Sequence, residues 1–485
     1  MKKIFYCVSV LFVLFVSAEG AFGYLGKSIR IMGFGDELAG VIQDEYTDIY
    51  RNPAYLSFVE RVKVFGQYNL YQHSELKIAE DFRNEEAGLA GIVLCLPKYG
   101  NLALIGELKP STTKDGSTKA SRSDYINYYT LDSSSVKRFS KETIQNFKVI
   151  YGFKLSPSLR LGVDFVYLKN YDDGDSNKTI VTHQKRYSED LMHYSKDDNM
   201  DNYSNSPDAQ RGTFGLVFTP GQRTSLDFAL YYEKLEYTKR TSSNRVSENI
   251  SVGIDTTLRK NFFWDTSRAP IKNRALGLDI NFKYHFPQKT ILAVLLGGRY
   301  QKNELSSLSQ NKDSTYSSLN FVNTGNAKTS LEHNDRILNF SIGIGAEKDF
   351  SSSIKIGVAL KGYWDREELD RFEWQKSSGI STQNDSVVGS TSYFAENRVK
   401  KTTNSYKLTF PIGTEVVLHK MIKARLGGEL SVKRTETETG YSTSSQGSYS
   451  QGFGLSYDER IFLDVYLEDA LTPIGNWMAK IEYRF

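Results

Sequence analysis

The last eleven residues, Gly475 to Phe485, constrain the fold more than any other stretch of the chain. Because successive side chains of a strand point to opposite faces, one face of this segment is apolar and aromatic and the other is mostly charged. A strand with lipid on one side and a hydrated lumen on the other needs this pattern, with aromatic residues at the membrane interface. We therefore predict the closing strand of a membrane β-barrel. The two alternating faces are Phe485, Tyr483, Ile481, Ala479 and Trp477, and Arg484, Glu482, Lys480 and Met478.

The same segment resembles the C-terminal signal of bacterial outer-membrane barrels, which end in Phe with apolar or aromatic residues at alternate positions. The resemblance implies recognition by the barrel-assembly machinery and insertion into outer-membrane lipid. The residues that carry the assembly signal are then Trp477, Ile481, Tyr483 and Phe485.

Alternation recurs from Glu60 onward, most clearly in Asn273–Phe286, where six apolar residues from Leu276 to Phe286 share a face. The connections alternate between short turns and long polar segments at roughly residues 73–87, 113–142, 172–209, 241–271, 305–335, 367–403 and 437–474. Short periplasmic turns and long external loops are typical of outer-membrane barrels. The sequence predicts an all-β fold, a single transmembrane antiparallel β-barrel of about 14 strands, within a range of about 12–16. Arg460–Glu468 also alternates, but an odd count would put Phe485 outside, so we assign it to the last external loop.

Composition excludes several other classes of protein. A membrane-spanning helix needs about 20 apolar residues, and the chain after residue 23 contains no such stretch. The full chain has a mean hydropathy of −0.44 despite 31 Tyr and 28 Phe. A net charge of +4 is too balanced to indicate a nucleic-acid partner. Lys2 and Lys3 precede the apolar run Ile4–Val16, which predicts a cleaved signal peptide over residues 1–23. We expect export to the bacterial outer membrane.

The stretch Leu25–Leu56 lacks the alternation of the later segments. Leu38, Val41 and Ile42 stand at helical spacing, which predicts a helix of about two turns over Asp36–Gln43. Asn52-Pro53-Ala54 follows, and proline biases the residue before it toward extended geometry. Residues 24–56 therefore cannot be part of the wall, and the barrel is expected over residues 57–485.

This stretch resembles the long-chain fatty-acid transporter superfamily (FadL/TodX type) and its PorV-like relatives. The resemblance is carried by Met32-Gly33-Phe34-Gly35, Ala39, Asp44, Asp48 and Asn52-Pro53-Ala54, while Tyr55 stands where the family usually has Gly. It implies that residues 24–56 form a hatch inside the lumen. The expected gate residues are Asp44, Asp48, Tyr50, Arg51, Asn52, Pro53 and Ala54.

Eight glycines are predicted on the inward face of the wall: Gly152, Gly162, Gly215, Gly277, Gly343, Gly345, Gly357 and Gly427. Two interpretations stay open, because glycine permits local bending of a sheet and also leaves volume for an internal plug. Inward Lys and Arg residues are expected to meet carboxylates of the N-terminal stretch.

Pro411 and Gly413 interrupt an otherwise apolar strand. Proline cannot donate to the ladder, which predicts a bulge. We keep open a side exit into the membrane at Pro411 and Gly413, as barrels of the resembled superfamily are thought to have for hydrophobic cargo.

No constellation indicates catalysis. The six histidines are scattered without metal-ligand spacing, and Gly454-Leu455-Ser456-Tyr457-Asp458 fails the nucleophile-elbow pattern at its last position. We expect no enzyme activity, no metal and no cofactor.

The first functional hypothesis is passive transport of small hydrophobic or amphipathic solutes past the N-terminal hatch. The alternatives are a non-conducting PorV-like adaptor or anchor for secreted proteins, and a general porin for polar solutes.

Overall fold

The computed structural model describes residues 29–34, 36–73, 82–96, 98–124, 128–186, 192–205, 208–252, 257–317, 321–384, 386–457, 460–468 and 477–485. The predicted signal peptide lies outside these ranges. Within these ranges four short helices precede the sheet: α2 (Ile29–Phe34), the 3₁₀ helix η1 (Asp36–Leu38), α3 (Glu45–Arg51) and the 3₁₀ helix η2 (Pro53–Phe58). Within the described residues, no helix has the length and apolar character needed to cross a membrane.

The described part of the chain forms one antiparallel sheet of seventeen strands. They are β1 (Lys63–His73), β2 (Phe82–Leu96), β3 (Gly100–Asp124), β4 (Tyr128–Lys154), β5 (Leu159–Arg186), β6 (Met192–Asn205), β7 (Asp208–Gly221), β8 (Thr224–Val252), β9 (Thr257–Phe286), β10 (Thr290–Ser317), β11 (Phe321–Asp349), β12 (Ile354–Gln383), β13 (Ser386–His419), β14 (Ile422–Thr437), β15 (Gly440–Tyr457), β16 (Ile461–Glu468) and β17 (Trp477–Arg484).

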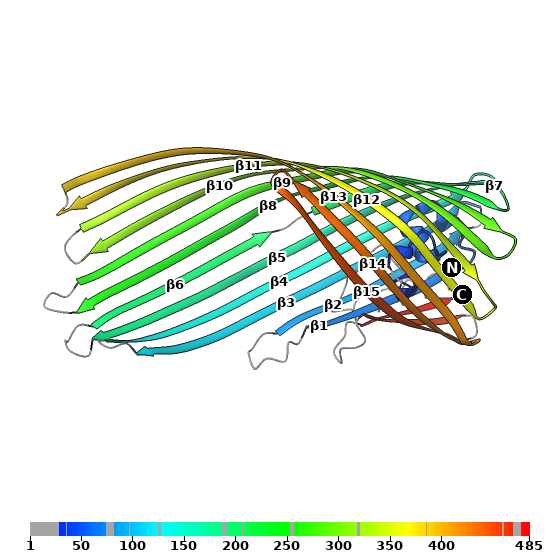
Figure 1. The fold of residues 1–485 in the computed structure, drawn as a ribbon, viewed down its shortest axis with the longest axis horizontal. Coiled ribbons are helices and arrows are strands. Elements are labelled where there is room, and N and C mark those ends of the chain that lie inside the picture. Colours follow the sequence, from blue (N-terminus) through cyan, green and yellow to red (C-terminus); the bar gives the residue numbers. More distant parts are fainter. Residues whose placement is uncertain are drawn as a thin grey trace.

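The sheet closes on itself. Neighbouring strands pair in sequence order, and β1 pairs with both β2 and β17 (Figure 1). β6 and β7 share one position, because both lie between β5 and β8, one beyond the other along the strand direction. The seventeen strands therefore fill sixteen positions in the described ring. The predicted all-β antiparallel barrel is confirmed.

The predicted count of about 14 strands is wrong. The two additional wall positions are β15 and β16, which lie in the stretch 437–474 that was assigned to the last external loop. Most of β15 is Ser, Gly, Gln and Tyr, so it gives almost no apolar alternation. β16 pairs with β15 on one side and β17 on the other, so it belongs to the wall.

Most of the predicted long loops are also strand. β13 has 34 residues and β9 and β12 have 30 each, whereas about 9–11 residues suffice to cross a membrane. These extensions run away from the end of the barrel that carries both labelled termini (Figure 1). Polar side chains predominate on both faces there, with scattered exposed apolar residues such as Leu308, Val387 and Phe394, so the regular apolar pattern disappears while the backbone pairing continues.

The outer face of the wall carries an apolar band. On β9, Leu276, Phe282 and Phe286 are exposed, whereas Asn281 and Lys283 are buried on the inner face. Leu276 to Phe286 covers about 33 Å of strand at about 3.3 Å per residue, or roughly 25 Å along the axis at a tilt near 45°. Exposed aromatic residues stand at the turn end of this band (Phe218, Phe286, Phe350, Tyr457) and at its other end (Tyr232, Tyr300, Tyr406). An exposed apolar surface of this size indicates contact with a membrane or with another protein. Its height matches the apolar band of membrane barrels.

The expected bulge at Pro411 is wrong. β12 and β13 keep the same register on both sides of Pro411, from Val358 opposite Ile412 to Lys361 opposite Thr409. Two pairs with β12 are missing, at Pro411 and at the neighbouring Phe410, and the proline has no N–H with which to make its own. The strand continues straight because the other edge of β13 pairs normally, with Pro411 opposite Glu429.

Candidate functional site

Residues 29–58, here called the N-terminal segment, pack against the inner face of the wall at the end with the short turns. α2 contacts β13 to β17, η1 contacts β12 and β13, and η2 contacts β3, β4, β5 and β7. Because these strands lie on different sides of the closed ring, the N-terminal segment reaches across the lumen. Figure 1 shows its dark blue helices beside the labelled termini.

Local capping shapes the N-terminal segment. Asp44 is the N-cap of α3, and its side chain accepts a hydrogen bond of 2.9 Å from the backbone N–H of Thr47. Asn52 ends α3 and caps η2 by accepting from the N–H of Ala54, and Pro53 occupies the first helical position, where no N–H is needed. The predicted helix over Asp36–Gln43 is wrong. Its apolar residues are buried, but only η1 forms there before a turn at Gly40, which has a φ of +84°.

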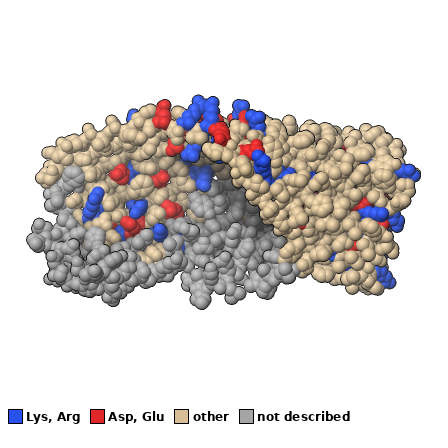
Figure 2. Space-filling view, in the orientation of Figure 1, with Lys and Arg blue, Asp and Glu red and all other residues tan. Residues whose placement is uncertain are grey.

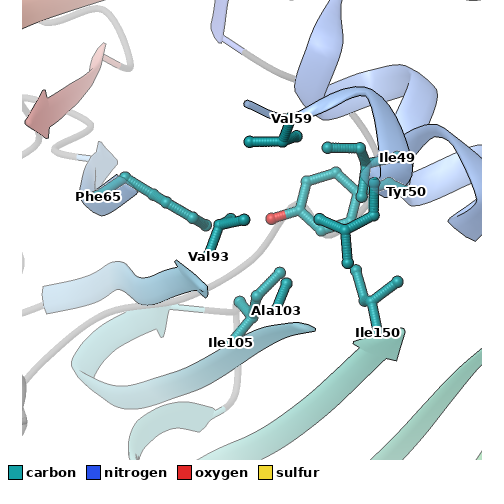
Figure 3. Packing of buried hydrophobic residues seen from close by; sticks show 9 residues of the cluster. Ile49, Tyr50, Val59, Phe65, Val93, Ala103, Ile105 and Ile150 are labelled. Carbon is teal, nitrogen blue, oxygen red and sulfur yellow. The ribbon is translucent and has the colours of Figure 1, made fainter. Parts of the chain in front are cut away.

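Two apolar clusters join the N-terminal segment to opposite parts of the wall. Figure 3 shows the first, in which Ile49 and Tyr50 of α3 lie against side chains of β1 to β4. In the second, side chains of α2, η1 and the turn after it lie against β10 and β12. The buried members are Ile49, Tyr50, Leu56, Val59, Phe65, Val93, Ala103, Ile105 and Ile150 in the first cluster, and Ile31, Phe34, Leu38, Val41, Ile42, Ala293, Leu295 and Ala359 in the second.

Inward glycines provide the space for this packing. A Cβ on Gly162 would lie 2.3 Å from the backbone N of Ala54, and one on Gly427 would lie 2.3 Å from the backbone of Phe34. Equivalent close approaches occur at Gly152, Gly215, Gly345, Gly357 and Gly413. At these positions the structure supports the plug-volume interpretation. Gly277 and Gly343 differ, because wall side chains fill the space there.

A chain of ion pairs connects α2 to β13, β14 and β16. Arg30 lies 3.2 Å from Glu415, which also pairs with Arg425 at 2.8 Å, and Arg425 pairs with Asp464 at 2.7 Å. Arg30, Arg425 and Asp464 line a cavity of about 390 Å³ together with Asp44, Lys480 and other charged residues. Burial lowers the pKa of Arg30, but Glu415 and Asp44 outweigh it and leave the pKa raised. Arg30 therefore stays charged.

Two further carboxylates of the N-terminal segment meet wall cations. Glu37 lies 3.4 Å from Lys361 and 4.0 Å from Lys407. Glu45 pairs with Lys63 at 2.5 Å. Sequence reasoning expected inward Lys residues to meet acidic residues here, but it did not single out Glu37.

The remaining contacts surround Asp48 and Asn52. Asp48 lies 3.9 Å from the buried Lys283. The amide of Asn52 donates to the backbone carbonyls of Leu216 at 3.0 Å and Phe228 at 3.2 Å. Tyr55, the departure from the resembled motif, donates to Asp227 of β8. Asn52 therefore ties the turn directly to two wall strands.

Burial raises the pKa of Asp48 to about 6, with Lys283 opposing the rise and Asp44 adding to it. A carboxyl in water has a pKa near 3.9. Between this pH and about pH 6, Asp48 therefore takes up a proton when α3 packs against the wall. The contribution of protonated Asp48 to the stability of this packing is fully present below about pH 4. It is lost as the pH rises through about 6, and the change in stability is roughly 3 kcal/mol.

We expect the conductance of the reconstituted barrel to rise between pH 4 and pH 7 as α3 loosens. Asp48→Asn should flatten this profile, because the amide stays neutral throughout. Single-channel recordings in planar bilayers provide the measurement, and Asp313→Asn on the distal extension is the matched control. An unchanged profile in Asp48→Asn contradicts the assignment to Asp48.

The other predicted site residues fall in two places. Pro411 is buried on the inner face, and a Cβ on Gly413 would lie 2.1 Å from the carbonyl oxygen of Phe34, so Gly413 sits beside α2. The side exit at this position stays a prediction. Ile481, Tyr483 and Phe485 face outward, and the backbone of Trp477 pairs with Leu70.

These features define a class: a closed antiparallel β-barrel with an outer apolar band and a short N-terminal segment packed inside. Comparison with family models gives no match, and comparison with curated protein sequences gives none. Among solved structures, the chain is similar in fold to proteins of the FadL/TodX type that its N-terminal motifs resemble.

Three of these structures are a Pseudomonas aeruginosa FadL homologue, the Pseudomonas putida toluene transporter TodX and the monoaromatic hydrocarbon channel CymD. Their identities to this chain are 9%, 11% and 9%, and their TM-scores are 0.35, 0.38 and 0.33. The matches cover 94%, 96% and 96% of this chain and 98%, 100% and 99% of theirs. At these values the likeness concerns the fold alone.

Proposed function

We propose that the protein is an outer-membrane β-barrel that lets small hydrophobic or amphipathic solutes cross passively, with the N-terminal segment as its gate. The observation that carries this proposal is the pairing of an outer apolar band with an inner wall whose apolar patches are covered by the N-terminal segment.

The inner apolar patches suit the proposed cargo. Val93, Ala103, Ile105 and Ile150 present an apolar surface that the side chains of Ile49 and Leu56 now cover. If the N-terminal segment withdraws, this surface meets water, at a cost of about 25 cal/mol per Å². An apolar solute that takes the place of those side chains recovers much of that cost, so solute and segment compete for one surface.

Two wall carboxylates keep their ion-pair partners when the segment moves. Glu415 retains Arg425, and Glu482 retains Lys480 at 3.2 Å and Lys63 at 3.8 Å. Opening therefore breaks the links made by Arg30, Glu37, Glu45 and Asp48 without leaving these two wall carboxylates unpaired. This arrangement supports a segment that can leave and return.

We expect a Gram-negative host that carries this barrel to take up radiolabelled toluene several-fold faster than the empty host, with sucrose entry unchanged. An apolar solute can replace the segment on the wall, whereas sucrose cannot. Tracer uptake by intact cells is the measurement, and the variant that lacks Tyr483–Phe485 is the control for assembly. Equal acceleration of sucrose points instead to a general porin.

The tall wall favours a second candidate function. Strands such as β12 and β13 extend far beyond the length needed to cross a membrane. This extension offers a large exposed surface to a secreted protein, as an adaptor would. Normal assembly without uptake of either tracer supports the adaptor.

A further inference from the structure

A row of four basic residues crosses the outer face of the wall. Lys234 of β8 lies directly opposite Arg274 of β9, Arg274 opposite Lys302 of β10, and Lys302 opposite Arg336 of β11. All four share the face of the exposed residues Tyr232, Leu276, Tyr300 and Leu338. We call these four residues the basic row.

The basic row stands at the edge of the apolar band. Two residues closer to the turns, the same four strands carry Tyr232, Leu276, Tyr300 and Leu338 in register. Tyrosine at a barrel surface marks the interface between hydrocarbon and headgroups. The first charged groups above that interface are therefore four cations, at the level of lipid phosphates.

Sheet stability does not explain this arrangement. Like charges directly opposite each other destabilise an antiparallel pair. The next row away from the band follows the usual preference, because Glu236 lies opposite Lys272 and Lys272 opposite Glu304. Carboxylates contact three of the four residues from the side away from the apolar band: Glu236 lies 2.9 Å from Lys234 and 3.7 Å from Arg274, and Glu304 contacts Lys302.

The basic row is bounded on both sides. Gln210 of β7 lies opposite Lys234, and Glu368 of β12 lies opposite Arg336. Four strands about 4.8 Å apart span about 14 Å, enough for roughly two phosphate groups, each between two neighbouring cations. A groove of about 540 Å³ adjoins the row at Lys302 and Arg336. In Figure 2, basic and acidic side chains gather midway along the long axis of the molecule.

We propose that the basic row binds the phosphate groups of an anionic lipid in the leaflet on the side of the long strand extensions. The acyl chains lie along the apolar band below, and the aromatic residues between them fix the depth of the headgroup. This inference rests on the membrane insertion in the proposed function, but not on what the barrel transports.

The test uses the full chain reconstituted in vesicles of phosphatidylcholine with phosphatidic acid, followed by native mass spectrometry of the released barrel. The variant Arg274→Gln/Lys302→Gln/Arg336→Gln should retain at least roughly tenfold less phosphatidic acid than the wild type, because each basic residue strengthens anionic-lipid binding several-fold. The matched control Lys312→Gln/Lys328→Gln/Lys376→Gln removes three charges from outward positions far along the extension, and should change retention less than twofold.

Further arms separate the causes of a negative result. Flotation with the vesicles reports insertion, so a wild type that does not float overturns insertion itself and with it the lipid site. Equal loss of phosphatidic acid in both triple variants overturns the basic row. Displacement of the lipid by inorganic phosphate, but not by chloride at equal ionic strength, shows a free-phosphate site and overturns the lipid as ligand.

Discussion

Deletion of residues 24–50, with Asn52–Ala54 retained, is expected to leave a folded barrel whose conductance in planar bilayers is several-fold higher than that of the wild type. The deletion removes α2, η1 and most of α3, which cross the lumen between β12–β17 and the opposite wall. The wall should still close, because Glu415 keeps Arg425 and the strand pairing does not involve the deleted residues. Asp48→Ala and Asn52→Ala should give smaller, intermittent increases by loosening the contacts with Lys283 and the carbonyl of Leu216.

A milder variant keeps this prediction testable if the deletion fails to fold. In Gly162→Ala, the added methyl group would lie 2.3 Å from the backbone of Ala54, so the N-terminal segment must shift. Gly298→Ala is the matched control, since nothing lies within 4 Å of its added Cβ. Higher conductance in Gly162→Ala alone supports the gate. Normal folding of both the deletion and Gly162→Ala without a rise in conductance contradicts it, and favours the adaptor.

The barrel itself was predictable wherever one face of a strand carries the outer apolar band. β9 shows this, because its outward apolar residues and inward polar residues alternate through Leu276–Phe286. The pattern fails where both faces meet water, as in the upper half of β13, or where the residues are small and polar, as in β15. Backbone pairing continues in both, but no alternation of side-chain polarity marks these strands. The sequence therefore predicts too few strands.

The N-terminal segment was predictable in part. The turn at Asn52-Pro53-Ala54 follows from local chemistry, since Asn52 caps η2 and Pro53 starts it. Contacts between distant parts of the chain were not predictable. Arg30 and Glu415 are 385 residues apart, and nothing near either residue identifies the other. The inward alternation of β13 would have placed Glu415 in the lumen, but not beside α2.

Removal of Tyr483–Phe485 is expected to lower the amount of folded, heat-modifiable protein in outer-membrane fractions at least tenfold. β17 joins β1 to β16, and the truncation removes two of its eight pairs with β1. It also removes the hydrogen bond from the N–H of Phe485 to the carbonyl of Val62 at 3.1 Å. β17 has only 8 residues, close to the minimum of about 9 needed to cross a membrane. Any shortening therefore weakens the seam, the pairing of β17 with β1 that closes the barrel.

The outward aromatic residues add to this effect, because the rings of Tyr483 and Phe485 pack edge to face at 4.6 Å at the turn end of the apolar band. Phe453→Ala, which removes an exposed aromatic residue from β15 without touching the seam, separates the two contributions and should assemble nearly normally. A loss in Phe453→Ala as large as in the truncation would show that aromatic anchoring in general, not closure between β17 and β1, limits assembly. Insertion of the truncated chain at wild-type levels would instead show that the remaining six pairs with β1 close the barrel, and that Tyr483 and Phe485 are not needed as an assembly signal.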